Sequence, residues 1–112
     1  MKIEDTSDLA LELAASKFAA LGSEQRLNVL RVLVRAGPEG LSIGTLGERA
    51  GVGGSTLTHH LRILTQAGLV RQARQGRSII CVAAAYDEVQ SLSHFLLKHC
   101  CADCGTTEHD HG

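Results

Sequence analysis

Breaks that contain glycine divide this chain of 112 residues into short apolar segments, and their spacing limits the folds that it can form. The breaks lie at Gly22, at 37–40, at 51–54, at Gly68 and at Gly76. Glycine interrupts helices and strands because it loses much conformational freedom on folding, and it supplies the positive φ angles of tight turns. No apolar run approaches the ~18–20 residues of a membrane span, so the pattern predicts one small domain of short helices and strands.

The first two segments have the apolar spacing of helices. Residues 7–21 form one amphipathic pattern, with Leu13 and Phe18 on its apolar face, and Gly22 ends it. Ser23 is a favourable N-cap for a second helix, which continues to about Ala36. The sequence therefore predicts two consecutive helices before the break at 37–40.

Two further helices are predicted on either side of the tight turn at 51–54. Ser42 is the expected N-cap of a short helix that ends near Ala50. The next helix opens at Gly54 or Ser55 and stops at Gly68. Its expected inward-facing residues are Leu57, Leu61 and Leu64.

The last third of the chain begins with hairpin chemistry. Two short strands are expected at 69–73 and 78–83, separated by a loop at 74–77 that contains a glycine. A final helix is predicted from about 87 to 101, with acidic residues at its start and Lys98 near its end. The polar tail 105–112 has no apolar content, so we expect it to be mobile.

The net charge of −1 hides a strong division along the chain. Residues 1–48 carry a net charge of −2, residues 87–112 carry −4, and residues 49–86 carry +5 with no acid. A basic segment between acidic flanks is typical of one surface that faces nucleic acid. The five arginines of this segment are Arg49, Arg62, Arg71, Arg74 and Arg77.

The order of the predicted elements defines the fold class. A helix–turn–helix followed by a hairpin and flanked by helices is a winged helix-turn-helix, mainly α with a β-hairpin wing. We expect one such domain over residues 1–104, with 105–112 as its tail. The basic segment coincides with the helix–turn–helix and the hairpin, which favours binding to double-stranded DNA.

Residues 50–70 contain the pattern His59-His60-Leu61-x-x-Leu64-x-x-Ala67-Gly68-Leu69-Val70, which resembles the ArsR/SmtB family of metal-responsive repressors. Leu21-Gly22-Ser23-Glu24-Gln25-Arg26-Leu27 is similar to the segment that leads into the second helix of that family. The resemblance covers about residues 7–103. It implies a homodimer built by the first and last helices, and operator DNA that is released when an inducer binds.

The DNA contacts are expected on the exposed side of the second helix of the helix–turn–helix and on the wing. Short hydroxyls near a helix N-terminus bond phosphates or base edges, and arginine pairs with phosphate or guanine. His60 is expected to be half-buried and structural instead. The predicted DNA-binding residues are Ser55, Thr56, Thr58, His59, Arg62, Arg74, Gln75 and Arg77.

Three thiols lie within five residues at the end of the last helix: Cys100, Cys101 and Cys104. Thiolates select soft ions, and trivalent arsenic takes three of them. Family members that respond to arsenite include a type with a Cys-Cys pair and a third cysteine at this place, which this chain resembles. The resemblance implies As(III), or Sb(III), as the inducer, and we expect no permanent cofactor. Cys81 stands alone in an apolar strand and is expected to pack in the core.

Two alternatives remain for these thiols within a repressor of the same fold. Cys101 and Cys104 with His109 and His111 have ligand types and spacing that suit zinc or cadmium. A pair of the cysteines is also a candidate thiol switch for oxidants or persulfides. A cytoplasmic location is expected because the acidic N-terminus is no signal peptide, and reduced thiols fit that compartment. We expect no enzyme, since a pocket with a base and a nucleophile is not indicated.

Overall fold

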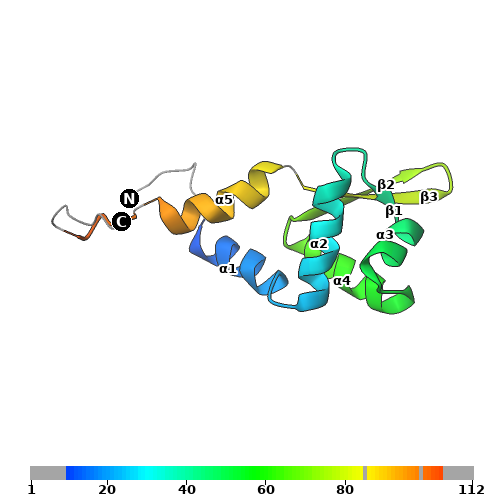
Figure 1. The fold of residues 1–112 in the computed structure, drawn as a ribbon, viewed down its shortest axis with the longest axis horizontal. Coiled ribbons are helices and arrows are strands. Elements are labelled where there is room, and N and C mark those ends of the chain that lie inside the picture. Colours follow the sequence, from blue (N-terminus) through cyan, green and yellow to red (C-terminus); the bar gives the residue numbers. More distant parts are fainter. Residues whose placement is uncertain (1–9, 85, 99, 105–112) are drawn as a thin grey trace.

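The computed structural model describes residues 10–84, 86–98 and 100–104, with eight helices and strands in the order expected of a winged helix-turn-helix (Figure 1). The elements are α1 (Leu11–Ala20), α2 (Glu24–Ala36), β1 (Leu41–Ser42), α3 (Ile43–Ala50), α4 (Gly54–Gln66), β2 (Val70–Gln75), β3 (Ser78–Ala83) and α5 (Tyr86–Leu97).

Two predicted N-caps are confirmed. The Oγ of Ser23 accepts a hydrogen bond from the backbone N–H of Arg26 at 3.3 Å, at the start of α2. The Oγ of Ser42 accepts one from the N–H of Thr45 at 3.2 Å, at the start of α3. Helix α4 begins at Gly54, after Gly53 as an N-cap without a side-chain bond. The two serines therefore fix where α2 and α3, the two helices before α4, begin.

The sheet has three antiparallel strands in the order β1-β3-β2, not the two that the sequence predicts. Strand β1 is the addition, and it pairs Leu41 with Cys81 and Ser42 with Ile80. The hairpin is also tighter than expected, because Gln75 pairs with Ser78 and leaves a turn of Gly76 and Arg77. Gly76 has a φ of 62°, which glycine adopts at little cost. The strands consequently extend through residues that we expected in the loop.

The core lies where α2, α3 and α4 meet the sheet. Leu57, Leu61 and Leu64 of α4 are buried, as predicted from their spacing. The other largest fully buried side chains are Leu33, Leu46, Leu69, Val29, Val70 and Cys81. The helix–turn–helix and the sheet therefore share one core.

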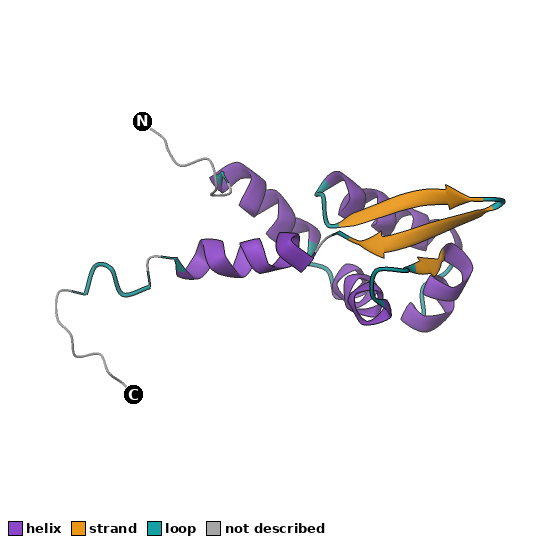
Figure 2. Ribbon diagram, turned by 90° about the horizontal axis from the view of Figure 1, so that it is seen from above, coloured by secondary structure: helices purple, strands orange, loops and turns teal. Residues whose placement is uncertain are grey.

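Helices α1 and α5 lie together at one end of the molecule, and the β2–β3 hairpin extends at the other (Figures 1 and 2). The predicted inner face of α1 is wrong in part: Leu13 and Phe18 are 55% and 39% exposed. Its buried residues are Ala14, Lys17 and Ala20, since only this side of α1 meets the rest of the chain. The larger apolar side chains of α1 consequently face away from the core.

The last helix is shorter than predicted. It ends at Leu97 rather than near Cys101, and residues 100–103 form turns in which Cys101 has a φ of 62°. No large apolar side chain follows Leu97 to hold another helical turn against the body. The tail 105–112 and the first residues of the predicted helix, 7–9, lie outside the described residues.

Candidate functional site

The outer side of α4 carries all five side chains that the sequence assigns to DNA on this helix. Ser55, Thr56, Thr58, His59 and Arg62 are exposed, while their apolar neighbours face the core. The Oγ1 of Thr58 donates to the carbonyl of Gly54 at 3.3 Å and keeps its lone pairs for acceptor contacts. The helix thus presents a polar, hydrogen-bonding face that includes the guanidinium group of Arg62.

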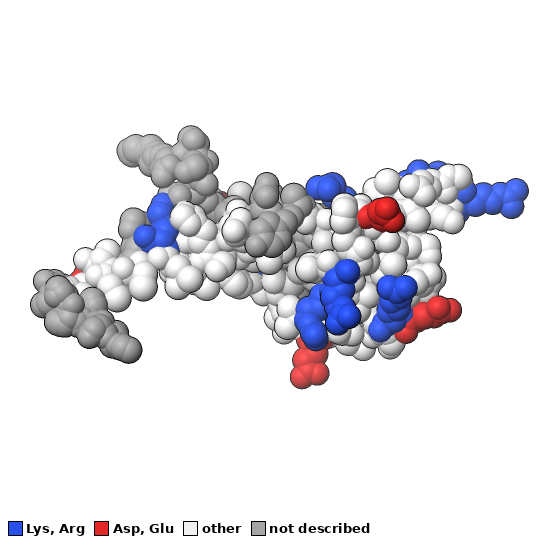
Figure 3. Space-filling view, turned by 45° about the horizontal axis from the view of Figure 1, so that its top comes forward, with Lys and Arg blue, Asp and Glu red and all other residues white. Residues whose placement is uncertain are grey.

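The three wing residues assigned to DNA are also exposed. Arg74 and Gln75 end β2, and Arg77 lies in the hairpin turn. Basic side chains stand at the end of the hairpin in Figure 3, beyond the body of the domain. Two guanidinium groups at the tip of a projecting hairpin suit contacts with a phosphate backbone.

The segment 49–86 does not form one basic surface, contrary to the expectation from its charge. Arg49, in the last turn of α3, lies with Arg31 and Arg35 of α2 around a hollow between those helices. Figure 3 shows a separate basic group on the body of the molecule. The sequence alone does not show that Arg49 is separated from the other arginines of this segment, because the packing of α3 on α2 places it among arginines of another segment.

Lys17 is a buried polar residue that the sequence analysis missed. It is only 6% exposed, and its Nζ donates to the carbonyl of Ala67 at 2.5 Å. Ala67 is the C-cap of α4, where unpaired carbonyls and the helix dipole favour a cation. In the sequence, Lys17 lies three residues after Ala14 and three before Ala20, the other two buried residues of α1, and this helical spacing indicates that its side chain is directed inward. Lys17 therefore ties α1 to the end of α4.

Another polar contact between helices is made by His60, which links α4 to the start of α2. Its Nε2 lies 2.8 Å from Gln25 Oε1, and its Nδ1 lies 3.5 Å from Arg26 Nη1. Burial, the charge of Arg26 and that of His59 lower the pKa of His60, in that order of importance. A neutral ring that donates from Nε2 and accepts at Nδ1 satisfies both contacts. The prediction of a structural rather than a DNA-contacting role fits this geometry.

The three candidate thiols are exposed at the end of α5, and two of them are in contact. The Sγ atoms of Cys100 and Cys101 lie 3.9 Å apart, and the N–H of Cys104 donates to the carbonyl of Cys101 at 3.0 Å. The hydrogen bond and charge of Cys101, followed by slight desolvation, raise the pKa of Cys100, so this thiol is protonated at neutral pH. Within the described residues no group of three or more His, Cys, Asp or Glu is placed to hold a metal ion.

The remaining thiol is part of the core. Cys81 is fully buried in β3, and this burial raises its pKa. A buried neutral thiol of this kind packs as a small apolar group. The expectation for Cys81 is confirmed, and His109 and His111 lie outside the described residues.

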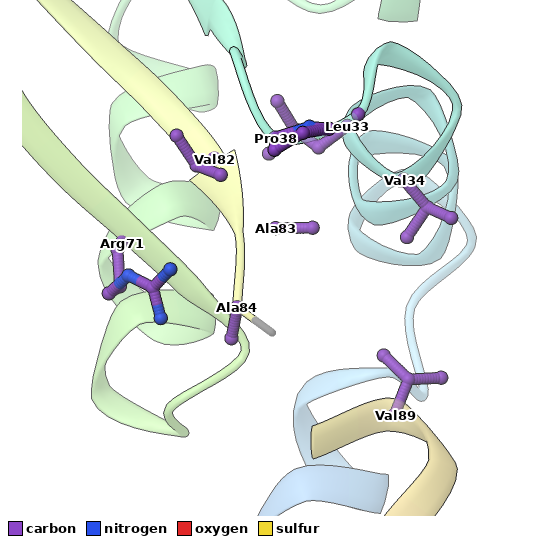
Figure 4. Close-up of a pocket in the computed structure, with 9 residues that line it drawn as sticks. Leu33, Val34, Pro38, Arg71, Val82, Ala83, Ala84 and Val89 are labelled. Carbon is purple, nitrogen blue, oxygen red and sulfur yellow. The ribbon is translucent and has the colours of Figure 1, made fainter. Parts of the chain in front are cut away.

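An apolar cavity of about 550 Å³ lies between α2, the sheet and the start of α5 (Figure 4). Arg71 is the one charged residue among its described lining, and it makes no hydrogen bond or ion pair with any residue that the structure describes. The apolar lining consists of Leu33, Val34, Gly37, Pro38, Val82, Ala83, Ala84 and Val89.

A helix–turn–helix whose second helix exposes polar groups, followed by a basic hairpin, defines a winged-helix regulator. Residues 21–73 match the family described as a helix-turn-helix domain. The chain is 30% identical to an ArsR-like transcriptional regulator from Rhodococcus sp. RHA1, covers 83% of each chain, and superposes on it with a TM-score of 0.67. The chain belongs to the ArsR family of transcriptional regulators.

Two curated relatives are regulators of the same kind. The uncharacterized HTH-type transcriptional regulator YceK of Bacillus subtilis is 34% identical over 67 residues, which are 60% of this chain and 66% of that protein. The HTH-type transcriptional regulator NmtR of Mycobacterium tuberculosis is 42% identical over 66 residues, which are 59% of this chain and 52% of that protein. The chain thus matches between half and two thirds of the length of these relatives.

The comparisons confirm that the chain is a regulator rather than an enzyme. Among the helices in the described part of the chain, none has the length and apolar character needed to cross a membrane.

Proposed function

We propose that this chain is a homodimeric transcriptional repressor that binds double-stranded operator DNA in the cytoplasm and releases it when As(III), or Sb(III), binds the thiols after α5. The observation that carries DNA binding is the polar face of α4 in one unit with a basic hairpin. In a winged helix-turn-helix the second helix of the motif enters the major groove, and the wing reaches the flanking backbone.

Exposed apolar side chains on α1 and α5 support a dimer through these helices. Leu11 and Leu13 of α1 are 73% and 55% exposed, and Leu96 and Leu97 of α5 are 64% and 60% exposed. Their contact with a second copy would remove apolar surface from water at about 25 cal/mol per Å². Two copies related by a twofold axis would then present two α4 helices to a pseudo-palindromic site.

The DNA interface is tested by the salt dependence of operator affinity. Arg62→Ala, on α4, should weaken binding and reduce the slope of log Kobs against log salt by about 0.9 if it removes one phosphate contact. Arg74→Ala with Arg77→Ala should reduce it by about twice that amount. Arg49→Ala, an exposed arginine between α2 and α3, is the matched control and should leave the slope unchanged. Equal slopes in all variants would exclude this interface.

Three features support As(III) as the inducer. Cys100 and Cys101 already bring their sulfurs to 3.9 Å, and Cys104 is bonded through its backbone to Cys101. All three are exposed and lie outside the helix, with Cys100 and Cys101 in turns and Cys104 directly after them, so the chain can bend to direct them at one atom. Three thiols would replace the three hydroxyl groups of As(OH)3. Each As–O bond that breaks gives an As–S bond, and each hydroxyl leaves as water with the proton of one thiol, so no net proton is released. Ligand exchange of this kind needs no oxidant.

Operator release by As(III) should require each of the three thiols. We expect Cys100→Ser, Cys101→Ser and Cys104→Ser to bind operator normally and to lose release by As(III) and Sb(III). Cys81→Ser is the matched control, because that thiol is buried in β3 and remote in sequence from the others. Normal arsenite release in Cys100→Ser and Cys104→Ser, or release of the wild type by zinc alone, would overturn the assignment to arsenic.

The contact between Cys100 and Cys101 also favours one alternative, a thiol switch. An oxidant would remove two electrons and two protons from two thiols to form a disulfide, whose mass is about 2 Da lower. Mass measurement and thiol titration before and after treatment with peroxide or a persulfide distinguish this reaction from metal binding. A Cd(II)- or Zn(II)-responsive site remains the other alternative, and its ions belong in the same release assay.

A further inference from the structure

We infer that the cavity beside Arg71 is a binding site for a small carboxylic acid with an aliphatic or aromatic body, separate from the thiols. The cavity volume of about 550 Å³ lies within the range of roughly 300–1,000 Å³ that is typical of small-molecule sites. Nothing in the DNA interface or in the thiol cluster uses this cavity or Arg71.

The chemistry of the lining selects the class of ligand. The described walls are aliphatic apart from one guanidinium, so they match a molecule with an apolar body and a single charged group. A guanidinium forms two parallel hydrogen bonds with a carboxylate, which fixes the orientation of the bound acid. A polyanion would need more than one cation, whereas Arg71 is the one cation of the described lining. Arg71 is exposed to solvent, so its guanidinium can be reached by the carboxylate of an incoming acid, and a neutral ligand would gain no charge-assisted hydrogen bond there.

The position of Arg71 is set by the sheet. Arg71 of β2 is the antiparallel partner of Val82 of β3, so both side chains stand on the same face. Figure 4 shows these two residues on one side of the cavity, with Leu33 and Val34 of α2 and Val89 of α5 across from the strands. A bound acid would therefore place its carboxylate at the sheet and its apolar body toward α2 and α5.

This location gives the site a regulatory consequence that rests on the proposed function. On one side the cavity is bounded by α2 and the sheet, which share a core with the DNA-binding helix α4. On the other side it is bounded by α5, a proposed dimer helix. A ligand that binds one arrangement of these elements better than another changes the population of that arrangement, and with it operator affinity.

The binding site is tested without DNA, so its failure is distinguishable from failure of the repressor function. The full chain is titrated calorimetrically, at concentrations where it is dimeric, with phenylacetate, 2-phenylethanol and 2-phenylethylamine. These probes share an aromatic body and differ in charge. We expect saturable binding of phenylacetate that is at least about tenfold tighter than that of the alcohol, and still tighter than that of the amine. Octanoate is the aliphatic acid probe.

Variants separate the role of Arg71 from a general effect of charge. Arg71→Gln should weaken phenylacetate at least about tenfold and reduce its preference over the alcohol, whereas Arg71→Lys should have an intermediate effect. Arg49→Gln, an exposed arginine of α3 that does not line the cavity, is the matched control and should bind the acid as the wild type does. The triple variant Cys100→Ser, Cys101→Ser and Cys104→Ser should also bind the acid normally. Absence of saturable binding of both acids up to about 10 mM, or equal binding by Arg71→Gln, would overturn the proposal.

Discussion

Replacing Lys17 by methionine tests whether the buried ammonium holds α4 against α1. Methionine keeps an unbranched apolar chain of similar length, so it preserves the packing of the stem and removes the donor. The carbonyl of Ala67, which accepts from Nζ at 2.5 Å, would lose this partner at the C-terminus of α4.

The size of the effect follows from the burial of this bond. A hydrogen bond to a charged group contributes about 1.5–3 kcal/mol to stability, and Lys17 is 6% exposed, so solvent does not replace the donor easily. Methionine also removes the cost of burying an ammonium group, which offsets part of the loss. We expect the free energy of unfolding to fall by about 1–2 kcal/mol, and operator affinity to fall several-fold because α4 is less firmly oriented.

Urea denaturation at one fixed protein concentration measures this change, since the stability of a dimer depends on concentration. Lys17→Gln, which keeps a neutral donor, should be intermediate. Arg31→Met, on an exposed surface of α2, is the control and should change stability by no more than about 0.5 kcal/mol. Unchanged or increased stability of Lys17→Met, with unchanged operator affinity, would refute the reasoning.

Three further predictions concern pH and backbone geometry. The pKa of Cys100 is raised and its thiol is protonated at neutral pH, so Cd(II) must release protons when it binds, and its affinity should fall as pH falls from 8 to 6. The affinity for As(OH)3 should change little over this range, and calorimetry in buffers of different ionisation enthalpy measures the protons released in each case. The lowered pKa of His60 means that the unfolded chain binds a proton before the folded chain does once pH falls below 6.5, so the wild type should lose stability there and His60→Gln should lose less. Equal pH slopes for the two proteins would contradict that assignment. Gly40 has a φ of 71° and approaches the backbone of Cys81 and, at 2.7 Å from an added Cβ, the side chain of Val82, so Gly40→Ala should destabilise by about 2–4 kcal/mol in thermal unfolding, with Gly44→Ala as the tolerant control.

Local patterns accounted for most of the helices and for the exposed face of α4. Ser23 and Ser42 cap helices through residues three positions away, so the sequence itself contains both partners of each bond. Leu57, Leu61 and Leu64 repeat at helical spacing, which fixes the outward direction of Thr58 and Arg62 as well.

The features that sequence reasoning missed depend on partners far along the chain. Strand β1 has only two residues, and its partners Ile80 and Cys81 lie in another segment. Lys17 meets a carbonyl 50 positions away. The same holds for Arg71, whose cavity is closed by α2 and α5. The three thiols are close in sequence, but periodicity alone does not give the conformation of the turns after Leu97.

The pairing of β1 with β3 has a mechanical consequence. Ser42 is both a strand residue bonded to the wing and the N-cap of α3, so the wing and the helix–turn–helix are joined on both sides of the motif. We expect this unit to move as one body, because a tilt of the hairpin alone would break the pairing of β1 with β3. An inducer at the end of α5 would then change the distance and angle between the two DNA-binding units of a dimer. It would not change how the α4 helix of each unit recognises bases in its own half-site. Operator variants with longer or shorter spacers between identical half-sites should therefore differ in how strongly the inducer releases them, while their preference for half-site bases stays constant.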